Sequence, residues 1–132
     1  MPSRLVRCSS LAPTPYAYAA VADPGTRTIH LAGACPLDAH GSTVAPGDVV
    51  AQTHRVMRNL RVALAEAGAE VLDVVFVRVL VASSQREDLV AAWQALRDDF
   101  GDHDPPATLQ GVTVLGYPDQ LVEVEAVAAI GD

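Results

Sequence analysis

The sequence contains no lysine, so all nine of its basic residues are arginine, and 16 acidic residues give a net charge of −7. A chain with this charge repels the phosphate backbones of nucleic acids. Aromatic residues are also scarce, with one Trp, three Tyr and two Phe, and no basic stripe is interleaved with them. These absences exclude the usual basic and aromatic binding surface, and we expect no nucleic acid as a partner.

Long apolar runs and cysteine pairs are absent as well. No apolar segment approaches the ~20 residues that a membrane-spanning helix needs, and residues 1–10 lack the apolar centre of a signal peptide. The two cysteines, Cys8 and Cys35, are too few for a disulfide framework. We therefore expect a cytoplasmic protein with free thiols that has no membrane as a partner.

Motifs for cofactors and metals are missing too. The glycines match neither a dinucleotide-binding nor a phosphate-binding pattern. His54 has no histidine partner four residues along, and the acidic loop around His103 lacks a recognisable metal-ligand spacing. We expect no cofactor and no metal.

Half of the 132 residues are apolar, which predicts one domain spanning residues 1–132 with a real core. Apolar residues at helical spacing predict a helix that starts after Asp48 and ends at Gly68, and a second helix that ends at Gly101. Runs rich in β-branched residues predict strands at 4–8, 16–21, 28–32, 72–81, 109–115 and 121–128.

Several local features of these elements are also predicted. Turn residues favour two hairpins, one that joins 16–21 to 28–32 and one that joins 109–115 to 121–128. Ser84 and Glu87 have the spacing of a capping box for the second helix. The nearly continuous apolar run at 72–81 is typical of a central strand buried on both faces.

The resulting order is β-β-β-α-β-α-β-β, in which helices alternate with strands only in the middle. This order favours an α+β fold, in which the two helices cover one face of a mixed sheet. The other face then needs a cover, and in so short a chain the candidate is another copy of the chain.

Five segments, in this order, resemble the RidA/YjgF family, the reactive intermediate deaminases. They are Ala12-Pro13 with Pro15-Tyr16, residues 31–38, Gly47-Asp48 with Gln52-Thr53 and Asn59-Leu60, Ala67-Gly68 with residues 73–75, and residues 105–128, which contain V-E-V-E-A-V-A. The resemblance covers nearly the whole chain. It implies a RidA-like, chorismate-mutase-like fold and a homotrimer that binds small molecules in clefts between its subunits.

The resemblance also implies the residues of that cleft. Glu123 becomes the catalytic acid or base, since a carboxylate in a partly apolar cleft can position or deprotonate water. The implied substrate-binding residues are Tyr16, Ala32, Gly33, Trp93, Thr108 and Gln110. The residues themselves leave open that Glu123 is a solvated glutamate paired with an arginine, that Tyr16 plugs the sheet edge, and that Trp93 belongs to the core.

Two residues near these positions have structural interpretations. We expect Cys35 to be a half-buried, inert thiol, because nothing in the sequence positions a base beside it. We expect Glu125 to form an ion pair.

Three positions depart from the family pattern. Ala32 stands where the family has a serine, and Ala34 stands where it has a glutamine. The third departure is at Thr108. Members that hydrolyse imines carry an arginine after Pro-Ala, which holds the substrate carboxylate, whereas Thr108 follows Pro106-Ala107 here. A threonine cannot make the bidentate, charge-assisted pair of a guanidinium. The expected function is that of a hydrolase or deaminase-like enzyme, with water addition to, or proton transfer on, an imine, enamine or related carbonyl compound, but not the usual amino-acid-derived imines. The alternative is a non-catalytic small-molecule-binding or regulatory module, such as an accessory protein of a biosynthetic pathway.

Overall fold

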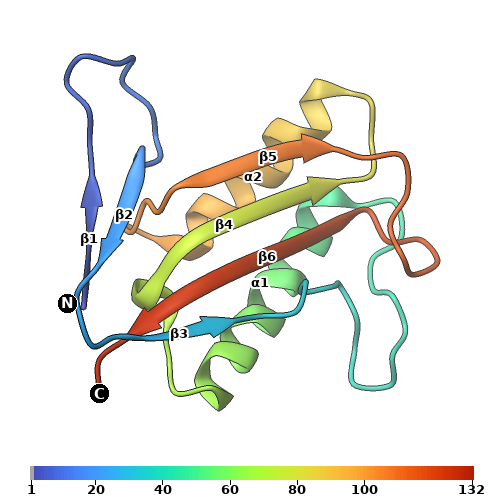
Figure 1. The fold of residues 1–132 in the computed structure, drawn as a ribbon. Helices are drawn as coiled ribbons and strands as arrows, with labels where there is room; N and C mark the ends of the chain where they lie inside the picture. The colour runs from blue at the N-terminus through green and yellow to red at the C-terminus, as the bar shows by residue number, and fades with distance from the viewer. Residues whose placement is uncertain (1) are drawn as a thin grey trace.

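The computed structural model describes residues 2–132, which form strands and helices in the predicted order (Figure 1). The elements are β1 (Ser3–Val6), β2 (Ala19–Ala22), β3 (Arg27–His30), α1 (Val49–Glu66), the short 3-10 helix η1 (Val71–Asp73), β4 (Val74–Val81), α2 (Arg86–Phe100), β5 (Ala107–Gly111) and β6 (Val122–Ile130). Within these residues, neither helix is both long enough and apolar enough to cross a membrane.

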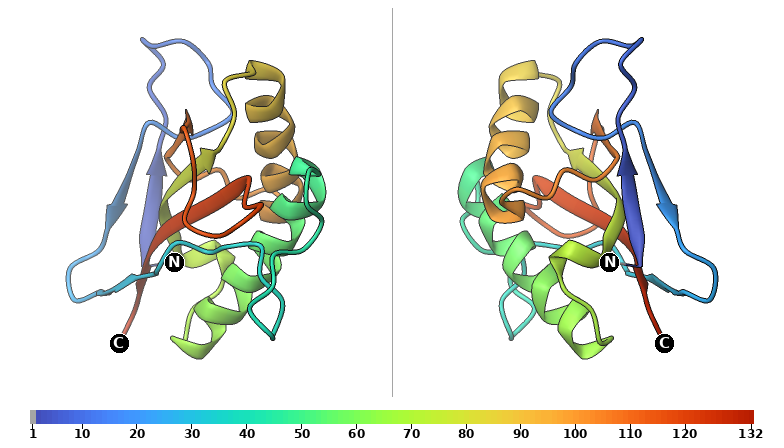
Figure 2. Two further views of the ribbon diagram at one scale, coloured as in Figure 1. Left: turned by 90° about the vertical axis from the view of Figure 1, so that its right-hand side faces the viewer. Right: turned by 90° about the vertical axis from the view of Figure 1, so that its left-hand side faces the viewer.

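The main sheet has four strands in the order β3-β6-β4-β5. Strand β4 runs parallel to β5 and antiparallel to β6, which in turn is antiparallel to β3, so the sheet is mixed. Both α1 and α2 lie against one face of it, and the two-stranded sheet of β1 and β2 stands on the other side (Figure 2). The predicted α+β fold, with two helices on one face of a mixed sheet, is confirmed.

Both ends of α1 and the C-terminal end of α2 lie where the sequence predicts them. The Asp48 carboxylate caps α1 by accepting a hydrogen bond from the Ala51 amide at 2.9 Å. Gly68 follows α1 with a φ of +87°, and Gly101 ends α2 with a φ of +67°. Both angles lie in the left-handed region, which glycine adopts without strain.

Both predicted hairpins are wrong. Strand β2 pairs back with β1, and β3 pairs with β6, so the turn after Asp23 leads from one sheet to the other. Residues 16–18 stay out of β2, because buried Ala17 donates its amide to the carbonyl of Asp104. Strand β5 pairs in parallel with β4, since α2 carries the chain back along the sheet. The loop after β5 then crosses to β6.

The capping box predicted for α2 is also wrong. The helix has Gln85 at its N-cap position and no side-chain capping bond there. The hydroxyl of Ser83, one residue before the predicted Ser84, accepts from the Gln85 amide at 3.0 Å and donates to the Asp88 carboxylate at 2.6 Å. The hydroxyl of Ser83 therefore makes the hydrogen bonds to the first turn of α2, and Ser84 is exposed.

Strand β4 is central as predicted, but in one chain it is buried on one face only. Its valines at 77, 79 and 81 face the helices and are at most 1% exposed, whereas the side chains between them are partly exposed. Strand β6 repeats this alternation, with its glutamates pointing away from the helices. We call the face without helices the open face. On β4, β5 and β6, its side chains are those of Phe76, Arg78, Leu80, Thr108, Gln110, Glu123, Glu125 and Val127.

Gln52 of α1 is fully buried and ties the helix to two loops. Its Nε2 donates to the carbonyls of Val44, Ala45 and Asp119, and its Oε1 accepts from the Leu121 amide at 2.8 Å. A buried amide with this many partners is costly to remove, because each backbone group that loses its partner stays desolvated.

We predict that Gln52→Leu lowers the free energy of unfolding by about 3 kcal/mol, since leucine leaves several buried backbone groups without a partner. Urea denaturation measures the loss. Gln94→Leu, on the exposed side of α2, is the matched control and should change stability by less than about 0.5 kcal/mol. Equal losses in the two variants would contradict this role of Gln52.

Candidate functional site

The strand register places the polar site residues in two rows across the open face. The neighbours are Thr108, Arg78 and Glu125 in one row, and Gln110, Leu80 and Glu123 in the next. Adjacent strands lie about 4.8 Å apart, so side chains on β5 and β6 are separated by roughly 10 Å across β4. Thr108 and Glu123 therefore share a face without touching.

The carboxylate of Glu123 is held at one oxygen and left unbonded at the other. Oε1 accepts hydrogen bonds from Cys35 Sγ at 3.3 Å and from Gln120 Nε2 at 3.2 Å. Oε2 lies against Gly33, and no hydrogen bond within residues 2–132 ends on it. Glu123 thus has a fixed orientation and one oxygen available to accept a proton.

Gly33 makes room for this carboxylate. Residues 31–34 run alongside β6, where the amides of Leu31 and Ala34 donate to carbonyls of that strand. A β-carbon built on Gly33 would lie 2.5 Å from Oε2 of Glu123, so any side chain here would displace the carboxylate. Two residues implied by the resemblance, Gly33 and Glu123, are therefore in direct contact.

Cys35 is the thiol donor to the carboxylate. Burial, followed by the hydrogen bond to Glu123 and the negative charge of Glu123, raises the pKa of the Cys35 thiol to about 11. The thiol is therefore protonated at neutral pH and acts as a donor rather than a nucleophile. The half-buried thiol agrees with our expectation, but its contact with Glu123 was not foreseen.

Gln120 is a site residue that the sequence did not reveal. It is 4% exposed, and its Nε2 donates both to Glu123 and to the Val122 carbonyl at 3.1 Å. Its Oε1 accepts from the Tyr117 amide at 3.1 Å. These bonds fix the turn before β6.

The only signal in the sequence for a role of Gln120 is its place three residues before Glu123, which is not specific. We call Gly33, Cys35, Gln120 and Glu123 the carboxylate site.

Tyr16, Trp93 and Thr108 meet elsewhere, at the edge of the sheet where β5 lies beside α2. Together with Ala107 and Leu109 they line a cavity of about 330 Å³, which we call the aromatic hollow. The rings of Tyr16 and Trp93 lie edge to face, with 6.2 Å between their centroids. Trp93 also packs against the core, so it belongs to the core and to the wall of the hollow.

The implied residues are thus divided between two places in one chain. Strand β4 lies between the carboxylate site on the β6 side and the aromatic hollow on the β5 side. Ala32 and Gln110 are exposed and line neither place. Glu125 forms the ion pair that we expected, with Arg78 at 3.2 Å.

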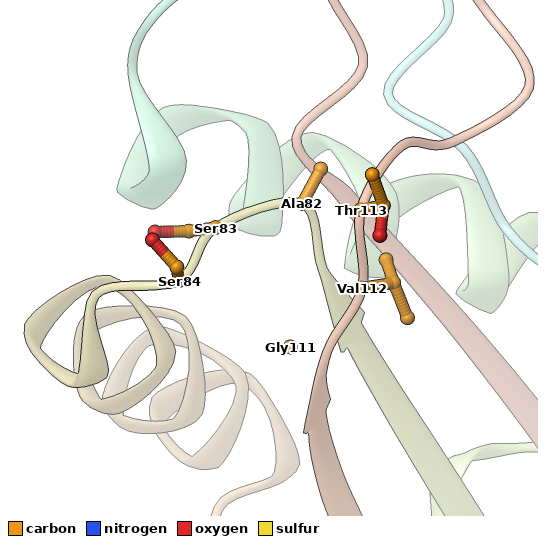
Figure 3. A pocket seen from close by; sticks show the side chains of 6 residues that line it. All are labelled: Ala82, Ser83, Ser84, Gly111, Val112 and Thr113. Carbon is orange, nitrogen blue, oxygen red and sulfur yellow. The ribbon is translucent and has the colours of Figure 1, made fainter.

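A further hollow lies at the carboxyl ends of β4 and β5 (Figure 3). It has a volume of about 670 Å³ and is lined by Ala82, Ser83, Ser84, Gly111, Val112 and Thr113. None of these side chains is an acid or a base, so the hollow offers no group for proton transfer. Across residues 2–132, no group of three or more His, Cys, Asp or Glu side chains is placed to hold a metal ion.

Known proteins with similar sequences and structures form one family. Residues 9–130 match the family model described as endoribonuclease L-PSP. A RutC family protein of Pyrococcus abyssi is 34% identical over 100 residues, which make up 76% of each chain. The 3-aminoacrylate deaminase RutC of Acinetobacter baylyi is 28% identical over 132 residues, 98% of this chain and 100% of that protein.

A solved structure gives the same result. The crystal structure of YyfB from Yersinia pestis, described as a protein of the conserved Rid family, matches with a TM-score of 0.89 at 31% identity, and the match covers 98% of this chain and 100% of that one. The residues matched by the family model include the carboxylate site and the aromatic hollow. This chain therefore belongs to the endoribonuclease L-PSP family, which is the RidA/YjgF, or Rid, family that its motifs resemble.

Proposed function

We propose that the protein is a homotrimer that binds a small molecule in clefts between its subunits and adds water to an imine, an enamine or a related carbonyl compound. Glu123 is the general acid and base. The observation that carries the proposal is the state of its carboxylate, with Oε1 held by Cys35 and Gln120 and Oε2 unbonded beside Gly33. The relative from Acinetobacter baylyi is named a 3-aminoacrylate deaminase, and an aminoacrylate is an enamine.

In imine hydrolysis, Oε2 of Glu123 takes a proton from water while the water oxygen bonds to the imine carbon. The C=N π electrons move to nitrogen, which receives that proton from the carboxyl group, and a carbinolamine results. Glu123 then removes the hydroxyl proton, the C–N bond breaks with its electrons on nitrogen, and the nitrogen takes the proton and leaves as ammonia. One water is consumed, and a carbonyl compound and ammonia are formed.

We propose further that the substrate carries no carboxylate. Thr108 stands where the family resemblance implies an arginine, and Arg78 beside it in the strand register is bonded to Glu125. A guanidinium with its own counter-ion is a weak anchor for a second carboxylate. An imine of an ordinary amino acid, such as 2-iminopropionate, should therefore be a poor substrate.

The proposed assembly rests on two features. The open face is partly exposed in one chain although it carries Phe76, Leu80 and Val127. Within one chain, the carboxylate site and the aromatic hollow are also separated. In an assembly, the carboxylate site of one subunit can face the aromatic hollow of its neighbour. In this proposal residues 1–132 form one domain, and the unpaired Cys8 and Cys35 favour the cytoplasm.

A second candidate function is a binding or regulatory module without turnover. The aromatic hollow favours it, because an apolar molecule can bind between Tyr16 and Trp93 without reaching Glu123.

We predict that light scattering gives a mass near three chains, because association covers the apolar part of the open face. Leu80→Asp places a charge on that face and should give smaller species. Val62 of α1 is 59% exposed, and Val62→Asp should leave the mass unchanged. A stable wild-type monomer at micromolar concentration would contradict the assembly.

We predict that Glu123→Gln lowers the turnover number at least about a hundredfold while binding is kept, because an amide cannot transfer the protons. The assay follows hydrolysis of an imine made in situ by a flavin-dependent amine oxidase from a simple alkylamine. Glu66→Gln, at the exposed end of α1, is the control and should be fully active. Equal activity in both variants would disprove the role of Glu123, and no turnover by the wild type in any substrate screen would favour the binding module.

We predict that Cys35 resists alkylation by iodoacetamide until the pH approaches about 11, because the unreactive neutral thiol predominates below its raised pKa. Rates are measured by mass spectrometry over an alkaline pH series in the Cys8→Ser background. Glu123→Gln should lower the midpoint, since it removes a negative charge next to the thiol. A midpoint that does not move would show that the two side chains are not coupled.

A further inference from the structure

One ion pair lies in the middle of the open face. Arg78 Nη1 donates one hydrogen bond to Glu125 Oε2, at 3.2 Å. The guanidinium carbon also lies 5.6 Å from the centre of the Phe76 ring. The two charged side chains are 43% and 39% exposed, so a small molecule can reach the pair.

This pair is not needed to hold the strands together. Exposed ion pairs contribute only about 0–1 kcal/mol to stability. The backbone ladder between β4 and β6 joins the two strands along their length without it. Loss of the pair should therefore leave the fold intact, and its effect on ligands can be measured separately.

Arg78 lies beside Thr108, the position where the resemblance implies an arginine. Among the described residues, Arg78 is the one arginine on the open face, and its register neighbour on β5 is Thr108. An unpaired guanidinium here would lie one strand, about 4.8 Å, from the position where the resemblance implies an arginine. It would present several donors to a ligand carboxylate.

We propose that Glu125 is a specificity-determining residue of the cleft, an inference that rests on the function proposed above. By pairing with Arg78, Glu125 cancels the positive charge beside Thr108, and it also repels an incoming carboxylate. The cleft thereby selects uncharged carbonyl and imine compounds. Removal of the Glu125 charge frees Arg78 for a bidentate pair with a ligand carboxylate.

The test compares two probes of similar size by calorimetry, pyruvate, which carries a carboxylate, and pyruvamide, which has an amide in its place. Glu125→Gln should bind pyruvate about tenfold more tightly than the wild type, the gain expected from one charge-assisted pair, with pyruvamide unchanged. Arg78→Gln should bind pyruvate more weakly than the wild type, because Glu125 loses its counter-ion. The double variant should lack the gain.

Asp132→Asn is the matched control. It removes the carboxylate of another exposed pair, in which Arg27 lies 3.2 Å from Asp132, and should change the binding of neither probe. Thermal unfolding and light scattering establish that each variant folds and assembles like the wild type. All these variants retain Glu123, and the experiment measures binding rather than turnover. A lack of turnover would count against the proposed function. It would not affect the result of this binding experiment.

The inference is overturned by unchanged pyruvate binding in Glu125→Gln, or by a gain that persists in the double variant. If Glu125→Gln does not fold, pyruvate binding by Arg78→Gln is the deciding measurement. Pyruvate binding equal to that of the wild type in Arg78→Gln would then refute the role of the pair.

Discussion

The two-residue alternation of strand β6 is the constraint on which the rest of the structure depends. Every second side chain from Val122 to Ala128 is small or β-branched and fits beneath the helices, where Val122, Val124 and Ala128 have no exposed surface. The same alternation sends Glu123 and Glu125 to the open face. A slip of one residue would bury both carboxylates and expose the core, so β6 has one workable register against β4.

The core and the carboxylate site share a set of hydrogen bonds. Gln52 reaches from α1 to the backbone of Asp119 and Leu121. The turn held in this way contains Gln120, whose amide orients Glu123. Packing of α1 against the sheet is therefore transmitted to the carboxylate through the backbone of one turn, and the geometry of the site depends on a helix that does not itself contribute a residue to it.

Most features that depend on one segment were predictable from the sequence, although the capping box of α2 was not, and strand pairing between distant segments was not predictable. Asp48 and Gly68 mark the ends of α1 by their own chemistry, and alternation alone separated Glu123 from the core residues. The hairpins were wrong because turn residues show that a chain bends but not which apolar faces then meet. The resemblance implied Gly33 and Glu123 as site residues. Gln120 becomes visible only once its turn is folded against the strand.

The strand order β3-β6-β4-β5 has a consequence for the nascent chain. Strand β6 lies between β3 and β4, yet the ribosome makes residues 122–130 after every other strand. Strands β4 and β5 and the helix between them are contiguous in sequence and can associate early, whereas β3 waits for a partner in this sheet. The apolar sides of α1 and β4 therefore stay uncovered late in translation, and chaperones that recognise such surfaces have their main opportunity at that stage.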